Sequence, residues 1–180
     1  EEGIKKTKVK EMIVVERLGS RTPWQNENDF CEAEIMDSED LLVILYTSGS
    51  TGKPKGIVHT CGGYTVQTYW TGKWIFDLKK DDVLWCTSDI GWVTGHTYTI
   101  YSPLLNGVPT LIFEGAPDWP SPDRWAQIIE RHKITTFYTA PTAIRMFEKY
   151  GADLLKKYRF DSLQLLGSVG EPIDEKAWQW

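Results

Sequence analysis

The stretch of this sequence best suited to chemistry is a run of small, hydroxylated and basic residues at positions 47–56. Its three glycines allow the backbone to bend sharply and to approach a ligand closely. Successive backbone N–H groups in such a loop form a concave anion site, to which short hydroxyls and lysines add donors and positive charge. The sequence therefore predicts a cradle for a polyphosphate, made by Thr47, Ser48, Gly49, Ser50, Thr51, Gly52, Lys53 and Lys55.

Two other interpretations of this loop are a flexible surface loop and the P-loop of nucleotide triphosphatases. A surface loop has a similar composition, but this one follows an apolar run, residues 41–46, which we expect to be a strand buried on both faces. Ligands of α/β proteins bind where such strands end, and Pro54 stiffens the segment. A P-loop requires G-x-x-x-x-G-K followed by Ser or Thr. Gly49 and Gly52 are too close for that pattern and Pro54 replaces the hydroxyl residue, which excludes this class.

Length and composition indicate an ordinary globular chain and argue against several kinds of partner. The 180 residues suffice for one domain with a hydrophobic core, and 41% hydrophobic with 25% charged residues is an ordinary composition. A net charge of −5 argues against a general nucleic-acid binder. No apolar run is long enough to span a bilayer, and the first residues lack the apolar segment of a signal peptide. We therefore expect neither a nucleic-acid partner nor a membrane partner.

Cysteine and histidine spacing bears on compartment and metal binding. The three cysteines, Cys31, Cys61 and Cys86, are widely spaced and form no C-x-x-C pair, which argues against a disulfide framework or a zinc site. A reducing, cytosol-like compartment fits them best, so a cytoplasmic location is predicted. The histidines are far apart in sequence, and no metal-ligating residue is predicted.

Segments typical of strands and helices alternate from residue 41 to residue 180. This order predicts an α/β fold with a largely parallel sheet flanked by helices. Strands are expected at residues 41–46, 83–87, 110–114, 135–139 and 162–168, and helices at 57–77, 97–105 and 141–150, with two more opened by Pro122 and Pro172. Residues 1–40 are expected to hold one strand, at 12–16, and an irregular connection. The predicted organisation is thus a connection, 1–40, and a partial nucleotide-binding domain, 41–180, of a longer protein.

Four groups of residues without helix or strand periodicity follow the predicted strands, at positions 47–56, 88–96, 138–142 and 167–172. The carboxyl ends of parallel strands share one edge of a sheet, where ligand crevices form. Each group alone could be a simple turn. Their common position predicts that they lie together and form one site.

Two of these groups allow both a structural and a functional interpretation. Trp92 is either a core residue between turn glycines or a wall that limits the size of a small apolar group. His96 is either a hydrogen-bonded structural residue, which is the commoner case, or a base. The glycine backbone before Glu171 could lie against an aromatic base, or it could simply connect a strand to a helix with an acid in its first turn.

The sequence closely resembles the acetyl-coenzyme A synthetase family, within the acyl-adenylate-forming superfamily, over roughly residues 41–180. The loop at 46–56 resembles the superfamily's signature loop, which embraces the β- and γ-phosphates of ATP. The stretch at 85–96 has a Gly-Trp-Val-Thr-Gly-His core that separates this family from luciferases and from peptide-synthetase adenylation domains. Stretches at 137–145 and 166–172 carry the rest of the match.

The resemblance implies an acetate–CoA ligase that uses ATP, Mg²⁺ and coenzyme A. In that family acetate attacks the α-phosphate of ATP to give acetyl-adenylate and pyrophosphate, and the thiol of coenzyme A then displaces AMP. By motif, the resemblance assigns Trp92, Val93, Thr94 and Val169 to the acyl pocket, Gly170, Glu171 and Pro172 to adenine, Trp92, Thr94 and Ala140 to coenzyme A, and the loop residues to phosphate.

The family's second pocket tryptophan, ribose-binding acid, hinge and catalytic lysine have no counterpart in these 180 residues, so activity is expected only of a full-length chain. Alternatives are a propionyl- or other short-chain acyl-CoA synthetase, a non-catalytic nucleotide-binding module, and, more remotely, a protein-interaction fragment suggested only by the nine tryptophans.

Overall fold

The computed structural model describes residues 30–47 and 52–180. The chain divides into two compact units, Glu1–Ile35 and Met36–Trp180. In the first unit the described residues, 30–35, are exposed and irregular. The strand predicted at residues 12–16 lies outside the described part of the chain. The elements below all belong to the second unit.

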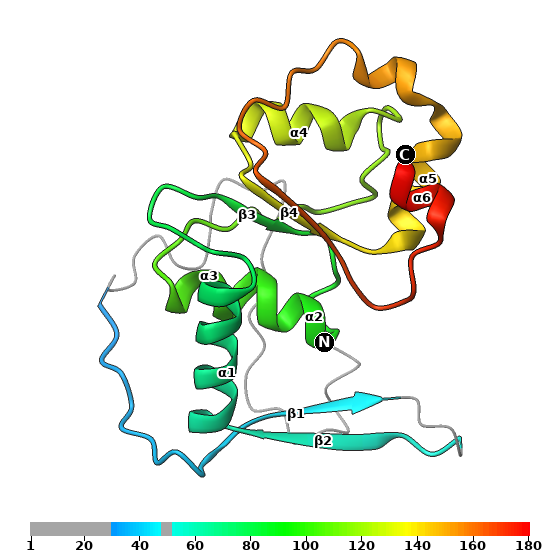
Figure 1. The fold of residues 1–180 in the computed structure, drawn as a ribbon. Coiled ribbons are helices and arrows are strands. Elements are labelled where there is room, and N and C mark those ends of the chain that lie inside the picture. The colour runs from blue at the N-terminus through cyan, green and yellow to red at the C-terminus, as the bar shows by residue number, and fades with distance from the viewer. Residues whose placement is uncertain (1–29, 48–51) are drawn as a thin grey trace, which may run out of the picture. The chain divides into compact units, whose positions relative to one another are not determined.

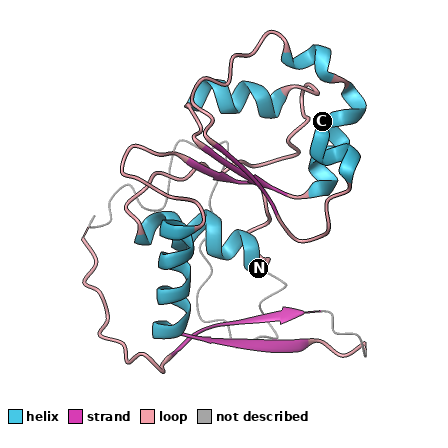
Figure 2. Ribbon diagram, viewed as in Figure 1, coloured by secondary structure: helices cyan, strands magenta, loops and turns pink. Residues whose placement is uncertain are grey.

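A three-stranded parallel sheet occupies the centre of the second unit, in the order β3 (Leu84–Cys86), β4 (Thr136–Thr139) and β5 (Leu165–Ser168). Trp85 pairs with Phe137, which pairs in turn with Leu166. Figure 2 shows these short strands side by side with helices nearby. The predicted α/β fold with a parallel sheet is therefore confirmed.

The strand predicted at residues 110–114 is reduced to a single bridge between Leu84 and Thr110. Leu84 donates its N–H to Pro109 and accepts from Leu111, at 3.0 and 2.9 Å. The next acceptor along β3 is the carbonyl of Cys86, and this oxygen receives the hydroxyl of Thr99 instead, at 3.5 Å. The hydrogen-bonded pairing between β3 and residues 109–111 therefore extends over a single residue pair.

The strand predicted at residues 41–46 is present, but its burial and its place in the parallel sheet were predicted wrongly. β1 (Leu41–Thr47) pairs antiparallel with β2 (Lys55–Thr60) in a separate two-stranded sheet, and Leu41 and Tyr46 are 54% and 66% exposed rather than buried on both faces. The helix predicted from residue 57 begins at Cys61, because the β-branched Ile57 and Val58 continue β2. The loop at 47–56 consequently joins the two strands of a hairpin (Figure 1).

Helical segments surround the parallel sheet. They are α1 (Cys61–Trp74), α2 (Val93–Gly95), a π-helical turn η2 (His96–Tyr101), α3 (Ser102–Leu105), α4 (Arg124–His132), α5 (Pro141–Tyr150), a 3₁₀ turn η3 (Ala152–Leu155) and α6 (Glu175–Gln179). The pair Gly62-Gly63 in α1 predicts close packing against another backbone, and Gly62 donates its N–H to the Ser38 carbonyl at 2.8 Å. Side chains of Ser102 and Asn106 bond to carbonyls of α1, which fixes α1 against α3.

Two helices begin later than their prolines predict, whereas α5 begins at Pro141 as expected. After Pro122, a turn in which Arg124 donates to the Ser121 carbonyl at 2.9 Å precedes α4. Helix α6 begins at Glu175, three residues beyond Pro172, because the Asp174 carboxylate accepts the N–H of Ala177 at 3.0 Å and caps the helix there.

The larger core lies between the sheet and helices α4 and α5. Its buried members are Trp85, Trp125, Ala126, Ile128, Ile129, Ile134, Phe137 and Phe147. Trp125 stacks on Phe147 with ring centroids 4.4 Å apart and an interplanar angle of 18°. The helical spacing of Trp125, Ile128, Ile129 and His132 predicts one buried face for α4. The first three are buried as this spacing predicts, but His132 is exposed in the last turn.

A buried carboxylate fixes the start of α4. Asp123, 5% exposed, accepts the Tyr158 hydroxyl at 2.7 Å and pairs with the Lys157 ammonium at 2.5 Å. Hydrogen bonds from Lys157 first, and then from Tyr158, hold the pKa of the Asp123 carboxyl well below its usual range. The folded chain therefore favours the carboxylate. This stabilisation is complete above the pKa of an unfolded aspartate and is lost only as the pH falls through the lowered value.

We expect the substitution Ile129→Ala to lower the free energy of unfolding by about 2–5 kcal/mol, because it leaves a cavity beneath α4. The smaller change Ile129→Val serves as a graded control and should cost about 0.5–1.5 kcal/mol. Urea denaturation of both variants measures the two losses. Equal stability of the Ala variant and the unsubstituted protein would contradict the described core.

At neutral pH, Asp123→Asn should lower the free energy of unfolding by about 1.5–3 kcal/mol, since the buried group then loses its charged hydrogen bonds. Tyr158→Phe removes one of those bonds and should cost about 1 kcal/mol. Denaturation at pH 7 compares them. Both variants unfolding at the same urea concentration as the unsubstituted protein would argue against the buried pair.

Candidate functional site

The carboxyl ends of the three parallel strands border a cavity of about 500 Å³. Its walls come from the segments that follow β3, β4 and β5. They are Thr87, Ser88, Trp92, Thr94, Pro117, Thr139, Ala140, Thr142, Ala143, Met146, Val169, Gly170 and Glu171. Three of the four groups predicted to share one edge are thus brought together, and we call this space the first cavity.

The floor of the first cavity is held by hydrogen bonds between neighbouring strand ends. The hydroxyls of Thr87 and Thr139 lie 2.6 Å apart, and Val169 donates its N–H to the Thr139 carbonyl at 3.0 Å. The N–H of Thr87 bonds to the carbonyl of Tyr138 at 3.0 Å. Because these bonds continue the sheet past its last paired residues, the walls begin from fixed backbone.

The segment at 88–96 folds tightly around Asp89. The Asp89 side chain accepts the N–H of Gly91 at 2.7 Å, and its carbonyl accepts that of Trp92 at 3.0 Å. Trp92 is 51% exposed and lines the first cavity, which favours its interpretation as a pocket wall over a core residue. Sequence reasoning missed Asp89, although an aspartate two residues before a glycine is a common turn signal.

Gly95 allows the segment at 88–96 to close on itself. A Cβ at Gly95 would lie 2.0 Å from the Asp89 carbonyl oxygen, a backbone atom that cannot move aside alone. A Cβ at Gly91 would meet only the Asp89 side chain, at 3.0 Å. Gly95, unlike Gly91, is therefore required for the path of the chain that places Trp92 and Thr94.

A second cavity of about 550 Å³ lies on the other side of Thr94 and Val169, which line both spaces. It is bordered by His59, Gly63, Tyr64, Gln67, Val93, Thr94, Thr97, Tyr98, Tyr138 and Val169. Of the predicted acyl-pocket residues, Thr94 and Val169 thus line both cavities, whereas Trp92 lines only the first and Val93 only the second. Sequence reasoning missed the wall supplied by α1, where Gly63, Tyr64 and Gln67 follow helical spacing that could have placed them on one face.

Burial favours the neutral form of two phenols that line the second cavity, Tyr138 and Tyr64. Burial raises the pKa of Tyr138 to about 12, and burial likewise raises that of Tyr64. The Tyr64 hydroxyl lies 2.7 Å from that of Thr97, which anchors it to η2. His96, the candidate base, packs beside Tyr101 with ring centroids 5.1 Å apart and lines neither cavity. Its buried Nε2 has no hydrogen-bond partner among the described residues, so neither a hydrogen-bonded structural role nor a role as base is supported.

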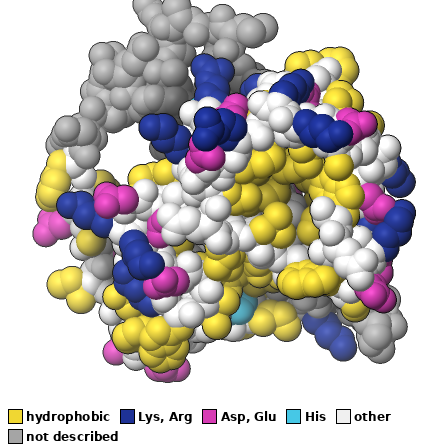
Figure 3. All heavy atoms as spheres, turned by 45° about the horizontal axis from the view of Figure 1, so that its top comes forward, with side chains coloured by type: hydrophobic (Ala, Val, Ile, Leu, Met, Phe, Trp, Pro, Cys, Tyr) yellow, Lys and Arg dark blue, Asp and Glu magenta, His cyan; other side chains and the backbone are white. Residues whose placement is uncertain are grey.

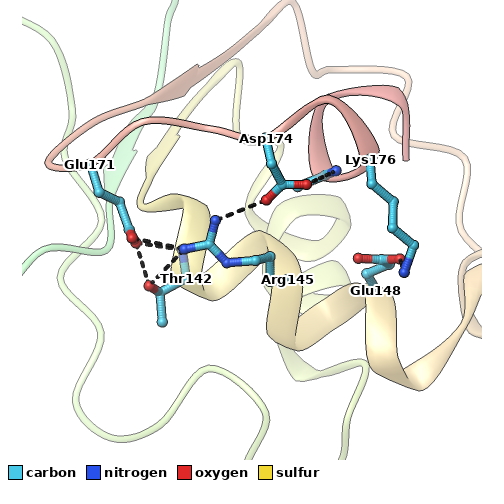
Figure 4. A network of polar contacts seen from close by, with 7 residues as sticks. Thr142, Arg145, Glu148, Glu171, Asp174 and Lys176 are labelled. Atoms are coloured by element: carbon cyan, nitrogen blue, oxygen red, sulfur yellow. Dashed lines mark hydrogen bonds and ion pairs between the residues drawn. The ribbon is translucent and has the colours of Figure 1, made fainter.

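The segment after β5 is fixed by charged hydrogen bonds. Glu171 accepts from the Thr142 N–H at 2.9 Å and from its hydroxyl, and Arg145 donates to Glu171 at 2.8 Å (Figure 4). The Thr142 hydroxyl first, and then its N–H and Arg145, lower the pKa of Glu171. The N–H of Ala177 and the Arg145 guanidinium lower that of Asp174. Gly170 and Glu171 line the first cavity, whereas Pro172, the third predicted adenine contact, does not.

The predicted phosphate loop is described only in part, since Ser48–Thr51 lie outside the described residues. Thr47 pairs with Lys55 at the end of the hairpin, and Gly52 has a positive φ of 77°. The described loop residues line neither cavity. The loop was expected to end a strand of the parallel sheet and instead closes the hairpin, so its role in phosphate binding stays a prediction.

The described residues contain no cluster of three His, Cys, Asp or Glu that could hold a metal ion. The three cysteines are free, with Cys86 buried, and burial raises the pKa of its thiol. Within residues 30–47 and 52–180 there is no helix whose length and apolar character would let it cross a membrane.

The fold and the first cavity define an α/β protein with a candidate site at the carboxyl edge of a parallel sheet, the arrangement found in nucleotide-binding α/β proteins. A model of the AMP-binding enzyme family matches residues 1–180. The chain belongs to this family.

Relatives named acetyl-coenzyme A synthetase match most of the chain. The protein from Rubrobacter xylanophilus is 55% identical over 184 residues, which cover 96% of this chain and 29% of the relative. That from Gemmatimonas aurantiaca is 58% identical over 151 residues, 84% of this chain and 23% of the relative. The protein from Pyrobaculum aerophilum is 51% identical over 191 residues, which cover 98% of this chain and 28% of the relative. The chain therefore spans less than a third of the length of these relatives.

Because Gly95 touches backbone, Gly95→Ala should lower the free energy of unfolding by more than about 3 kcal/mol or displace the segment that carries Trp92. Gly91→Ala is the matched control and should cost less than about 1 kcal/mol, since only the Asp89 side chain must move. Thermal and urea denaturation compare the two variants. Equal losses would show that the close approach at Gly95 does not constrain the segment.

Proposed function

We propose that these residues are part of an acetate–CoA ligase that forms acetyl-CoA from acetate, ATP and coenzyme A. The observation that carries the proposal is the composition of the first cavity. It brings together Trp92, Ala140 and Glu171, three residues from separate segments that the family resemblance assigns to the acyl group, coenzyme A and adenine. The names of the relatives support the same activity.

The proposed reaction has two displacements. A carboxylate oxygen of acetate attacks the α-phosphorus of ATP, the bond to the bridging oxygen breaks, and pyrophosphate leaves. The sulfur of coenzyme A then attacks the acyl carbon, the bond to the AMP oxygen breaks, and the thiol proton is released. Since the second step needs the acyl carbon exposed to the thiol, a cavity whose walls serve both ligands, such as the one containing Trp92 and Thr94, suits it.

Within this proposal the apolar and hydroxyl-bearing walls position the reacting groups. Trp92 and Val169 would enclose the methyl group of acetate, and Gly170 with Glu171 would border the adenine. The described residues include no cluster of three His, Cys, Asp or Glu that could hold a metal ion, and Mg²⁺ supplied with ATP would neutralise part of the charge of the phosphates. Residues 47–55 would hold the same phosphates.

We further propose that the activity belongs to a longer chain and to a reducing, cytosol-like compartment. Large side chains such as Trp74, Ile112 and Trp178 are 72%, 71% and 73% exposed, and Figure 3 shows hydrophobic side chains over the face it presents. We infer that some of these side chains pack against further parts of a longer protein, because contiguous exposed apolar patches are typical of interaction surfaces. The compartment is inferred from three free cysteines.

Acetate-dependent exchange between ATP and pyrophosphate tests the proposal. The full-length protein that contains these residues should catalyse exchange when acetate is present and should form acetyl-CoA when coenzyme A is added. The same assay on the 180-residue chain should give no sustained exchange. Absence of acetate-dependent exchange by the full-length protein would reject the ligase and favour a non-catalytic nucleotide-binding module.

Propionate is the nearest alternative substrate. The observation that favours considering it is the second cavity. About 550 Å³ of space lies beyond Thr94 and Val169, more than one methylene requires. One methylene is worth about 1–3 kcal/mol of discrimination, so the ratio of kcat/KM for acetate to that for propionate should lie between about 10 and 200. A ratio below one would replace acetate by propionate in the proposal.

A further inference from the structure

We propose that Arg145 is a positioning residue of the nucleotide site, which acts through Glu171 without touching the substrate. The inference rests on the proposed function, because it concerns how the segment that borders adenine is held. Arg145 lies on α5 and Glu171 follows β5, so the contact joins segments separated by 26 residues in sequence. Neither the guanidinium nor α5 beyond Met146 borders the first cavity.

The Glu171 carboxylate caps α5 from outside that helix. Helix α5 has no side-chain cap of its own, since its N-cap residue is Ala140 and its first residue is Pro141. The free N–H of Thr142 bonds to one Glu171 oxygen at 2.9 Å, and the Thr142 hydroxyl bonds to the same oxygen. A carboxylate at this position satisfies an unpaired N–H and interacts favourably with the positive end of the helix.

Arg145 completes this arrangement by holding the other carboxylate oxygen. One guanidinium nitrogen donates to Glu171 at 2.8 Å, and another donates to Asp174 at 3.1 Å. Asp174 is in turn the N-cap of α6, through its bond with Ala177. One side chain of α5 therefore fastens both ends of the connection formed by residues 171–174, as Figure 4 shows.

These contacts show that the charge of Glu171 is used to hold the protein together. Both carboxylate oxygens are engaged by Thr142 and Arg145, yet the residue lines the first cavity. The part of Glu171 that remains to border a ligand is its backbone, next to the backbone of Gly170. Gly170 has a positive φ of 94°, so the direction of this backbone depends on how the following residue is tethered.

Arg145 is half-buried and its two partners are carboxylates, which together explain why lysine is not equivalent here. The planar guanidinium presents separate N–H groups to the two acids at once, whereas a lysine ammonium is a single point charge. Arg145→Lys keeps the charge and loses the double contact. Arg145→Met removes both while retaining most of the side-chain length.

The chain offers a matched control on the same pair of helices. Lys176 of α6 forms an ion pair with Glu148 of α5, and neither residue lines the first cavity. Lys176→Met therefore breaks a link between α5 and α6 without touching the connection at 171–174. A general loosening of these two helices would affect both variants, whereas a positioning role affects only Arg145→Met.

The experiment measures KM for ATP, acetate and coenzyme A, together with kcat and thermal unfolding, in the full-length protein. Arg145→Met should raise the KM for ATP by about tenfold to a hundredfold while the KM for acetate changes by less than about twofold. Arg145→Lys should recover part of this loss, and Lys176→Met should leave all three KM values unchanged. An unchanged KM for ATP, a parallel rise in all three KM values, or an equal effect of Lys176→Met would overturn the inference.

A second variant covers the case in which Arg145→Met does not fold. Glu171→Gln keeps an oxygen for Thr142 but removes the charged partner of Arg145, so it should reproduce the rise in KM for ATP in part. Adding Arg145→Lys to it should cause little further loss, because the two residues act as one unit. Additive losses would overturn the inference. If the unsubstituted protein lacks acetate-dependent exchange, the proposed function fails; if it is active and the variants match it, only this inference fails.

Discussion

Parallel pairing of three short strands is the constraint on which the rest of the site depends. A parallel sheet places the carboxyl ends of β3, β4 and β5 at one edge, and the hydroxyl contact between Thr87 and Thr139 extends that alignment beyond the last paired residues. The aromatic core fixes the position of the strands, because Trp85 of β3 and Phe137 of β4 are almost completely buried beside Trp125. The cavity is therefore made by loops whose starting points cannot shift independently.

The loops at this edge are fixed by local hydrogen bonds and by close backbone contacts rather than by burial. Asp89 and Gly95 determine the path that carries Trp92, while Glu171 and Arg145 determine the path after β5. Each of these loops can present backbone to a ligand without first being ordered by it. Such preorganisation reduces the conformational entropy that is lost when a ligand binds.

The sequence allowed the parallel sheet, the extent of α5 and the gathering of three strand-end segments to be predicted, because each depends on local periodicity and on a general rule of α/β folds. It failed where the outcome depends on pairing partners. An unbroken apolar run at 41–46 does not reveal whether its partner is a parallel strand or, as observed, residues 55–60 of the same hairpin. The start of α6 depended on the Asp174 cap rather than on Pro172, and the wall supplied by Tyr64 required knowledge of how α1 packs.

In the proposed site, the residues that shape the cavities are not the residues that could neutralise the phosphates of ATP. Neither cavity is lined by Lys or Arg, and the nearby guanidinium of Arg145 is already neutralised by Glu171 and Asp174. The described walls are thus suited to shape and hydrogen bonding but poorly suited to stabilising a polyphosphate. If the site binds ATP as proposed, the charge that stabilises the phosphates comes from outside the described walls. Because the first cavity is lined by no lysine or arginine, loss of Lys53 and Lys55 would leave its adenine and acyl walls intact and would remove the countercharge that these residues are proposed to supply.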